Sequence, residues 1–148
     1  MSKNPKMIDL SSNMKMLNQY LKDDERFMAV LLFGSYGTQF QHLLSDVDFG
    51  VLTREKLNID EQLKIMSDFT DIFHEDDINI VFLNDNDLVI QNQVITTGRL
   101  VFCRDDIFLA DFIEYVSKRF IDFQIDLNSF YRDYDQALKE EFVDGRSR

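Results

Sequence analysis

The chain has 148 residues, 45% of them apolar, and a formal net charge of −11 from 27 acidic and 16 basic residues. This length suits one domain with its own core. The acidic balance argues against a protein that grips a nucleic-acid backbone, because phosphates call for clustered Lys and Arg.

The single cysteine, Cys103, cannot form an internal disulfide and fits a reducing cytoplasm. The start of the chain lacks the pattern of a signal peptide. No apolar run approaches the roughly 20 residues of a membrane helix. We therefore expect a cytoplasmic protein that does not associate with membranes.

The first part of the chain predicts a loose tail over residues 1–6 and a helix over 8–21, where apolar residues recur at helical spacing. The apolar run over 27–33 is too short for a typical helix. It ends at Gly34, which favours a buried strand followed by a tight turn.

A possible phosphate site follows this strand. Gly34 has no Cβ, so a ligand can approach its backbone closely. Ser35 comes next, where a short helix is expected to begin, and the unpaired N–H groups of a helix start suit a phosphate. After Ser45, the pattern predicts a second strand over 46–53.

Two acidic residues open that second strand. Side chains alternate along a strand, so Asp46 and Asp48 are predicted to share one face, while their apolar neighbours face the core. Two adjacent carboxylates repel each other unless a cation lies between them. Mg²⁺ binds through one or two carboxylates plus substrate phosphates, so the stretch from Gly34 to Asp48 predicts a Mg-nucleotide site. Asp-x-Asp taken alone also fits a solvated strand end.

Alternating helices and strands are predicted downstream. His74, beside acidic residues, is interpreted as a helix end rather than a metal ligand, because a positive charge is favourable there. The order of elements favours an α/β fold with a small mixed sheet and the helices on one side. The elements are a helix over 59–73 capped by Asp60, a strand over 78–83, a helix over 88–97 ended by Gly98, and an edge strand over 100–103.

The C-terminal part, residues 105–142, contains no Gly or Pro and predicts one long helix or two helices with a kink. Its apolar face is longer than a small sheet can cover. We therefore expect part of it to be exposed, as a partner surface or a homo-oligomer contact. The residues of this face are Phe112, Val116, Phe120, Phe123, Leu127, Tyr131, Tyr134 and Leu138.

The pattern Gly34-Ser35, ten residues, then Asp46-x-Asp48 resembles the signature of the minimal nucleotidyltransferases of the DNA polymerase beta superfamily. Within it, the chain is similar to the MntA family, the antitoxins of HEPN/MNT toxin–antitoxin pairs. That likeness is carried by Leu83-Asn84, by Gly98 to Phe102, and by the segments 119–123 and 134–138. It covers most of the chain and implies a single nucleotidyltransferase domain over 1–148.

The resemblance also implies a function. MntA proteins transfer AMP from ATP to a tyrosine hydroxyl of their partner toxin HepT, an HEPN-type ribonuclease. It follows that Gly34, Ser35 and Ser45 would bind the nucleotide, and that Asp46 and Asp48 would ligate Mg²⁺. Direct binding of nucleic acid is not expected.

The chain departs from the superfamily pattern at two places. Gly37, Thr38 and Gln39 stand where many members have Ala, Arg and Gly. At the position of the third catalytic carboxylate, on a later strand, stands Asn79. An amide can ligate a metal but cannot act as a base. Asp77, two residues earlier on the same strand face, is the alternative metal ligand.

Two other functions stay open. The chain could be an antitoxin that neutralises its partner by binding alone, as Asn79 and the acidic surface suggest. It could also transfer a nucleotide to a small molecule, although such enzymes usually carry a further domain for the acceptor.

Overall fold

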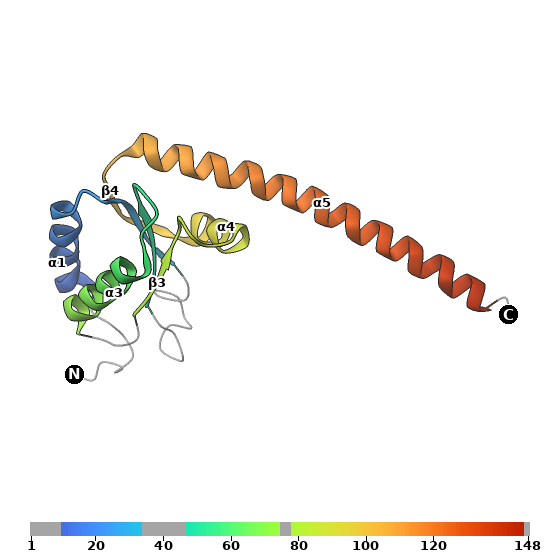
Figure 1. Ribbon diagram of the computed structural model, residues 1–148, viewed down its shortest axis with the longest axis horizontal. Coiled ribbons are helices and arrows are strands. Elements are labelled where there is room, and N and C mark those ends of the chain that lie inside the picture. Colours follow the sequence, from blue (N-terminus) through green and yellow to red (C-terminus); the bar gives the residue numbers. More distant parts are fainter. Residues whose placement is uncertain (1–9, 34–46, 75–77, 147–148) are drawn as a thin grey trace.

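The computed structural model describes residues 10–33, 47–74 and 78–146 of the chain (Figure 1). The predicted tail over 1–6 and the segment 34–46 lie outside the described residues. The elements follow the predicted order, with ends that differ by a few residues. They are α1 (Leu10–Asp23), β1 (Phe27–Phe33), β2 (Val47–Thr53), α3 (Ile59–Phe73), β3 (Ile78–Phe82), α4 (Leu88–Thr97), β4 (Arg99–Cys103) and α5 (Asp106–Arg146).

The four strands form one mixed sheet in the order β3-β2-β1-β4. Strand β1 pairs with β2 and with β4 in antiparallel fashion, whereas β2 and β3 run parallel. Strand β4 lies at an edge, as predicted. Both central strands, β1 and β2, carry the apolar runs of the sequence, and each is hydrogen-bonded to a neighbouring strand on two sides.

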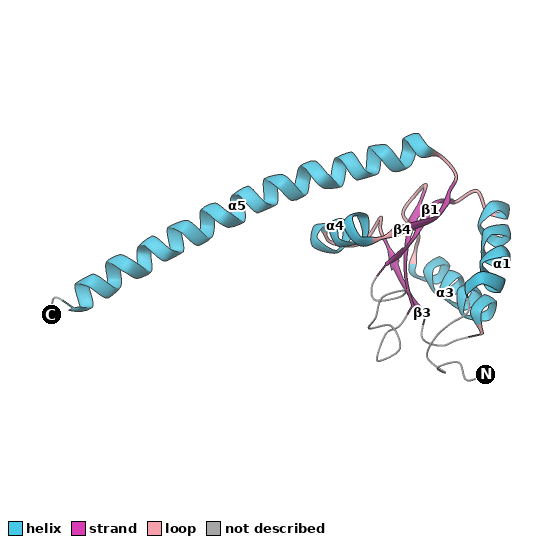
Figure 2. Ribbon diagram, turned by 180° about the vertical axis from the view of Figure 1, so that it is seen from behind, coloured by secondary structure: helices cyan, strands magenta, loops and turns pink. Residues whose placement is uncertain are grey.

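Helices cover both faces of the sheet, which corrects the expectation that they lie on one side (Figure 2). Helices α1 and α3 pack on one face, where the Phe49 ring lies 5.3 Å from Phe69 and 5.5 Å from Phe73. Helix α4 and the first turns of α5 pack on the other face. The reason is that β1 is apolar on both of its faces, and a strand of that kind needs cover on both.

Helix α5 is a single uninterrupted helix of 41 residues, about 60 Å long at 1.5 Å per residue. Its first turns pack on the body through Phe108, Leu109 and Phe112, and Val116 is fully buried. Every residue from 121 to 140 is exposed except Leu127, which is half-buried. The prediction that part of the helix is exposed is therefore confirmed, and the helix projects from the body (Figure 1).

Arg104 fastens the base of α5 to the end of α1. Its guanidinium donates hydrogen bonds to the carbonyl oxygens of Leu21 at 2.7 Å, Lys22 at 3.0 Å and Asp24 at 3.2 Å, and its Nε donates to Phe27 at 2.8 Å. The carbonyls of Leu21 and Lys22 lie in the last turn of α1, where a cation is favourable. In the described ranges no helix is both long enough and apolar enough to cross a membrane.

Helix α3 begins at a capping box, two residues before the cap predicted from the sequence. The N-cap is Asn58 and not Asp60: its side chain accepts from the Glu61 N–H, and the Glu61 carboxylate accepts from the Asn58 N–H. Asp60 lies in the first turn. The other end was interpreted correctly, since His74 is the C-cap, in a left-handed conformation with φ 53°.

This assignment predicts different effects for two neighbouring substitutions. Asn58→Ala should lower the free energy of unfolding by about 1 kcal/mol, because it leaves N–H groups at the helix start without a partner. Asp60→Ala should cost less than about half of that, since only the favourable charge at the helix start is lost. Urea unfolding followed by circular dichroism measures both. A larger loss for Asp60→Ala would contradict the cap assignment.

Gly50 allows α4 to lie close against β2. A Cβ added at this position would stand 2.6 Å from the Val94 side chain, so we expect Gly50→Ala to destabilise the chain by about 1–3 kcal/mol through overpacking. Adding Val94→Ala should recover part of this loss, because it removes the methyl groups that clash. Thermal unfolding of the single and double variants tests the contact, and purely additive losses would show that it is absent.

Candidate functional site

Asp48 lies on the central strand β2, near the end of the sheet. Its neighbours Val47 and Phe49 are buried, at 2% and 0% exposure, on the face covered by α1 and α3. Alternation along the strand turns Asp48 to the opposite face, which it shares with Gly50 and Leu52. Its side chain is partly exposed there. The local sequence therefore sets the direction of this carboxylate.

Asn79 lies directly beside Asp48 on the parallel neighbour β3. The two residues are register partners, and the Asn79 Nδ2 donates a hydrogen bond to the Asp48 Oδ1 at 3.2 Å. Asn79 thus lies next to Asp48, as the resemblance to the superfamily implies. The amide orients the carboxylate, and both residues take part in further interactions.

The end of β1 completes this corner of the sheet. Phe33, its last residue, pairs with Asp48 across the antiparallel ladder. Gly34 follows Phe33 directly in the chain, so the sequence connects the predicted phosphate turn to this same corner. The remaining candidates lie outside the described residues, and their roles stay predictions: Gly34, Ser35, Ser45, Asp46 and Asp77.

The described part of the site offers donor atoms of the kind that a hard cation binds. A carboxylate and an amide both offer oxygen, which Mg²⁺ prefers. Within the described ranges, no three His, Cys, Asp or Glu side chains gather as a metal site. Asp48 is the carboxylate that this part of the chain contributes at the corner. Asn79 cannot take up a proton in the neutral range, so it can position groups but not act as a base.

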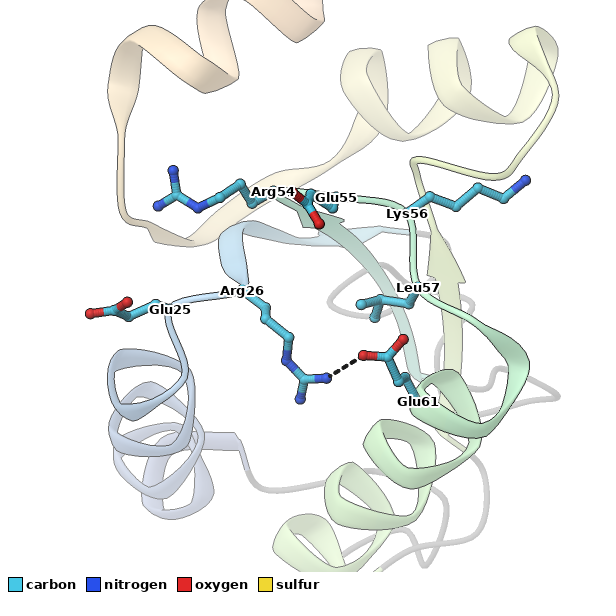
Figure 3. A pocket seen from close by; sticks show the side chains of 7 residues that line it. All are labelled: Glu25, Arg26, Arg54, Glu55, Lys56, Leu57 and Glu61. Carbon is cyan, nitrogen blue, oxygen red and sulfur yellow. Dashed lines mark hydrogen bonds and ion pairs between the residues drawn. The ribbon is translucent and has the colours of Figure 1, made fainter.

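A cavity of about 330 Å³ lies at the other end of the same strands (Figure 3). Arg26 dominates it, and its guanidinium contacts Asp24 at 2.6 Å and Glu61 at 3.1 Å. The hydrogen bonds that Arg26 donates to Asp24 hold the pKa of that carboxyl below its usual value. Three basic residues and three acidic residues line the cavity together with one leucine, so its charges balance. Such a balance suits a structural ion-pair cluster better than a site for a charged ligand.

A second, larger groove of about 580 Å³ runs between α4 and α5. Lys56, Tyr115 and Arg119 lie along it, and the Arg119 guanidinium stacks on the Tyr115 ring at 5.1 Å. The walls of this groove come from segments far apart in the chain, so no local pattern in the sequence predicts it. Like the first cavity, it opens near the residues that follow β2 and not at Asp48.

Comparisons with solved structures support the fold. A chain of a toxin–antitoxin crystal structure with AMP-PNP matches with a TM-score of 0.69 and 22% identity, over 82% of this chain and 97% of the other. A structure of tri-AMPylated Shewanella oneidensis HEPN toxin in complex with MNT antitoxin gives 0.67 and 20%, over 84% and 98%. The toxin–antitoxin MntA–HepT gives 0.64 and 19%, over 82% and 96%. At these identities the likeness shows a shared polymerase-beta-like fold.

No curated protein matches the chain. The family described as Polymerase beta, Nucleotidyltransferase matches residues 15–107, which span β1, β2, β3 and β4 and include Asp48 and Asn79. The match covers more than half of the 148 residues. The chain therefore belongs to the polymerase beta nucleotidyltransferase family.

Proposed function

We propose that this protein is an antitoxin that transfers AMP from ATP to a tyrosine hydroxyl of an HEPN-type toxin, with Mg²⁺ bound at Asp46 and Asp48. The observation that carries the proposal is the Asp48 carboxylate. The strand pattern holds it at the corner where β1 ends and β2 and β3 begin, beside Asn79. Membership of a nucleotidyltransferase family supports the reaction type.

The solved structures of similar fold support the partner and the nucleotide. One contains AMP-PNP, an analogue of ATP, and another contains an HEPN toxin that carries AMP groups together with an MNT antitoxin. This chain covers nearly the full length of those chains. The single cysteine of the chain suits the reducing cytoplasm in which we place such a pair.

In the proposed reaction the tyrosine oxygen forms a bond to the α-phosphorus of ATP, the bond from that phosphorus to the pyrophosphate breaks, and the phenolic proton leaves to water. Bound Mg²⁺ would neutralise charge on the phosphates and on the departing pyrophosphate. Asp48 and Asp46 would hold the cation, while Gly34, Ser35 and Ser45 would hold the triphosphate. The contribution of the protein is positioning and electrostatics.

Asn79 places a neutral amide where the superfamily has a third carboxylate. Because the amide donates a hydrogen bond to Asp48, it orients the carboxylate without adding a second negative charge beside it. It cannot accept the phenolic proton, so the reaction must proceed without a base at this position. Asp77, outside the described residues, is the remaining candidate for a third carboxylate.

The same amide favours one alternative function, an antitoxin that neutralises its partner by binding alone. In that case the site would be a remnant, and binding would depend on the exposed part of α5. The two proposals differ in whether Mg-ATP is consumed. Nucleotide transfer to a small molecule stays a third possibility, but no described feature favours it.

Asp48→Asn should reduce AMP transfer by about 100-fold or more, because it removes the charge of a metal ligand from the site while it preserves the side chain's shape. The measurement is transfer of labelled AMP from ATP to the HEPN toxin in the presence of Mg²⁺. Asp60→Asn, an exposed acid in the first turn of α3, is the matched control and should leave the rate unchanged. Full activity of Asp48→Asn would contradict the assignment of Asp48 as a metal ligand.

Asn79→Asp should increase transfer by about tenfold or more, since a carboxylate here can ligate the cation and accept a proton. Without Mg²⁺ the variant should melt at a lower temperature than the natural chain, because two carboxylates then stand side by side. Added Mg²⁺ should reverse this difference. If neither the rate nor the response to Mg²⁺ changes, Asn79 does not stand at the position of a third ligand.

A further inference from the structure

The projecting part of α5 carries an apolar seam with the spacing of a coiled coil. Its members alternate at steps of three and four residues, which is the pattern of helices that pack along their length. Phe130 and Tyr134 are 61% and 54% exposed, and their rings stack on each other at 6.3 Å. The seam consists of Phe120, Phe123, Leu127, Phe130, Tyr134 and Ala137.

The seam continues a face that already serves as an interface within the molecule. Phe112 packs against the sheet and Val116 is fully buried, and both lie on the side of the helix that carries Phe120. The helix itself extends past the edge of the body (Figure 1). The exposed stretch from 121 to 140 spans about 30 Å. A contiguous apolar surface of this size marks an interaction site.

The charges beside the seam indicate what covers it. Asp126, Asp133 and Glu140 follow one another at steps of seven residues along one flank, and all three are exposed. The other flank carries Gln124, Tyr131 and Leu138. Flanking residues of this kind set partner choice and orientation, because they meet the flanks of the facing helix.

A second copy of the chain is a poor match for these flanks. In an antiparallel pair, the acidic flank of one helix would face the acidic flank of the other. In a parallel pair, the acids would face Gln, Tyr and Leu, without any opposite charge. A helix with Lys or Arg beside its own apolar stripe would complement the acidic flank along its whole length, and this preference agrees with the net charge of −11.

We propose that the exposed half of α5 docks an amphipathic helix of a partner protein, whose apolar stripe is bordered by basic residues. The identification of this partner with the toxin rests on the proposed function, whereas the docking surface does not. The seam supplies the buried contact area, and Asp126, Asp133 and Glu140 select a basic helix over an acidic one and over a second copy.

The test uses the full chain and two synthetic helical peptides of about three heptads. Both have Leu at the seam positions, and one has Lys on its flanks while the other has Glu. Fluorescence anisotropy should show that the Lys peptide binds at least about tenfold tighter than the Glu peptide. Asp126→Lys with Asp133→Lys should reverse this preference. Phe130→Ser with Tyr134→Ser should abolish binding of both peptides.

Asp122→Lys with Asp135→Lys is the matched control, because it changes the net charge equally at exposed positions away from the seam. It should leave the preference for the Lys peptide in place. If it reverses the preference as fully as the seam pair does, the attraction is general and the docking surface is wrong. If the chain sediments as a dimer that Phe130→Ser with Tyr134→Ser converts to a monomer, the occupant is a second copy.

The outcome is separable from that of the proposed function, because the measurement needs neither ATP nor Mg²⁺. Asp48→Asn should bind the Lys peptide as the natural chain does. A chain that docks the peptide but transfers no AMP would overturn the proposed reaction and leave the docking surface intact. A chain that transfers AMP but binds the two peptides equally well would overturn the docking surface and leave the proposed reaction intact.

Discussion

Strand β2 is hydrogen-bonded to β1 on one side and to β3 on the other, and helices cover both of its faces. A shift of one residue in its register would move Phe49 out of the core and turn Asp48 into it, which the packing forbids. The direction of the Asp48 carboxylate and its place beside Asn79 both follow from this constraint. Gly50 adds to it, because α4 can approach β2 only where no Cβ intervenes.

The molecule separates two tasks in space. The corner at Asp48 belongs to the sheet and lies on a rigid strand, which suits chemistry that depends on accurate positions. The exposed half of α5 belongs to no layer and offers an apolar seam with acidic flanks, which suits recognition of another helix. Arg104 fixes the start of the second part, because its hydrogen bonds to the end of α1 hold the junction from which α5 departs.

Several details of the fold followed from local patterns, and several did not. The strand over 27–33 and the helix over 88–97 were predicted with the bounds that the structure has, because each is delimited by turn residues or caps. The cap of α3 was misplaced by two residues, since Asn58 and Asp60 are both good cap residues and only the reciprocal bonds with Glu61 distinguish them. The helices were expected on one side of the sheet, although the two-sided apolar character of β1 was already visible.

Local sequence by itself determined the elements, the face on which Asp48 lies and the apolar seam of α5, because periodicity of two or 3.6 residues is a local property of the chain. The family signature determined the class of reaction that the corner suggests. Tertiary structure alone decided which strands are neighbours, and with them the contact between Asp48 and Asn79, which are 31 residues apart. It also decided where along α5 the cover by the body ends, since the size of a sheet depends on how strands pair and not on any single stretch of sequence.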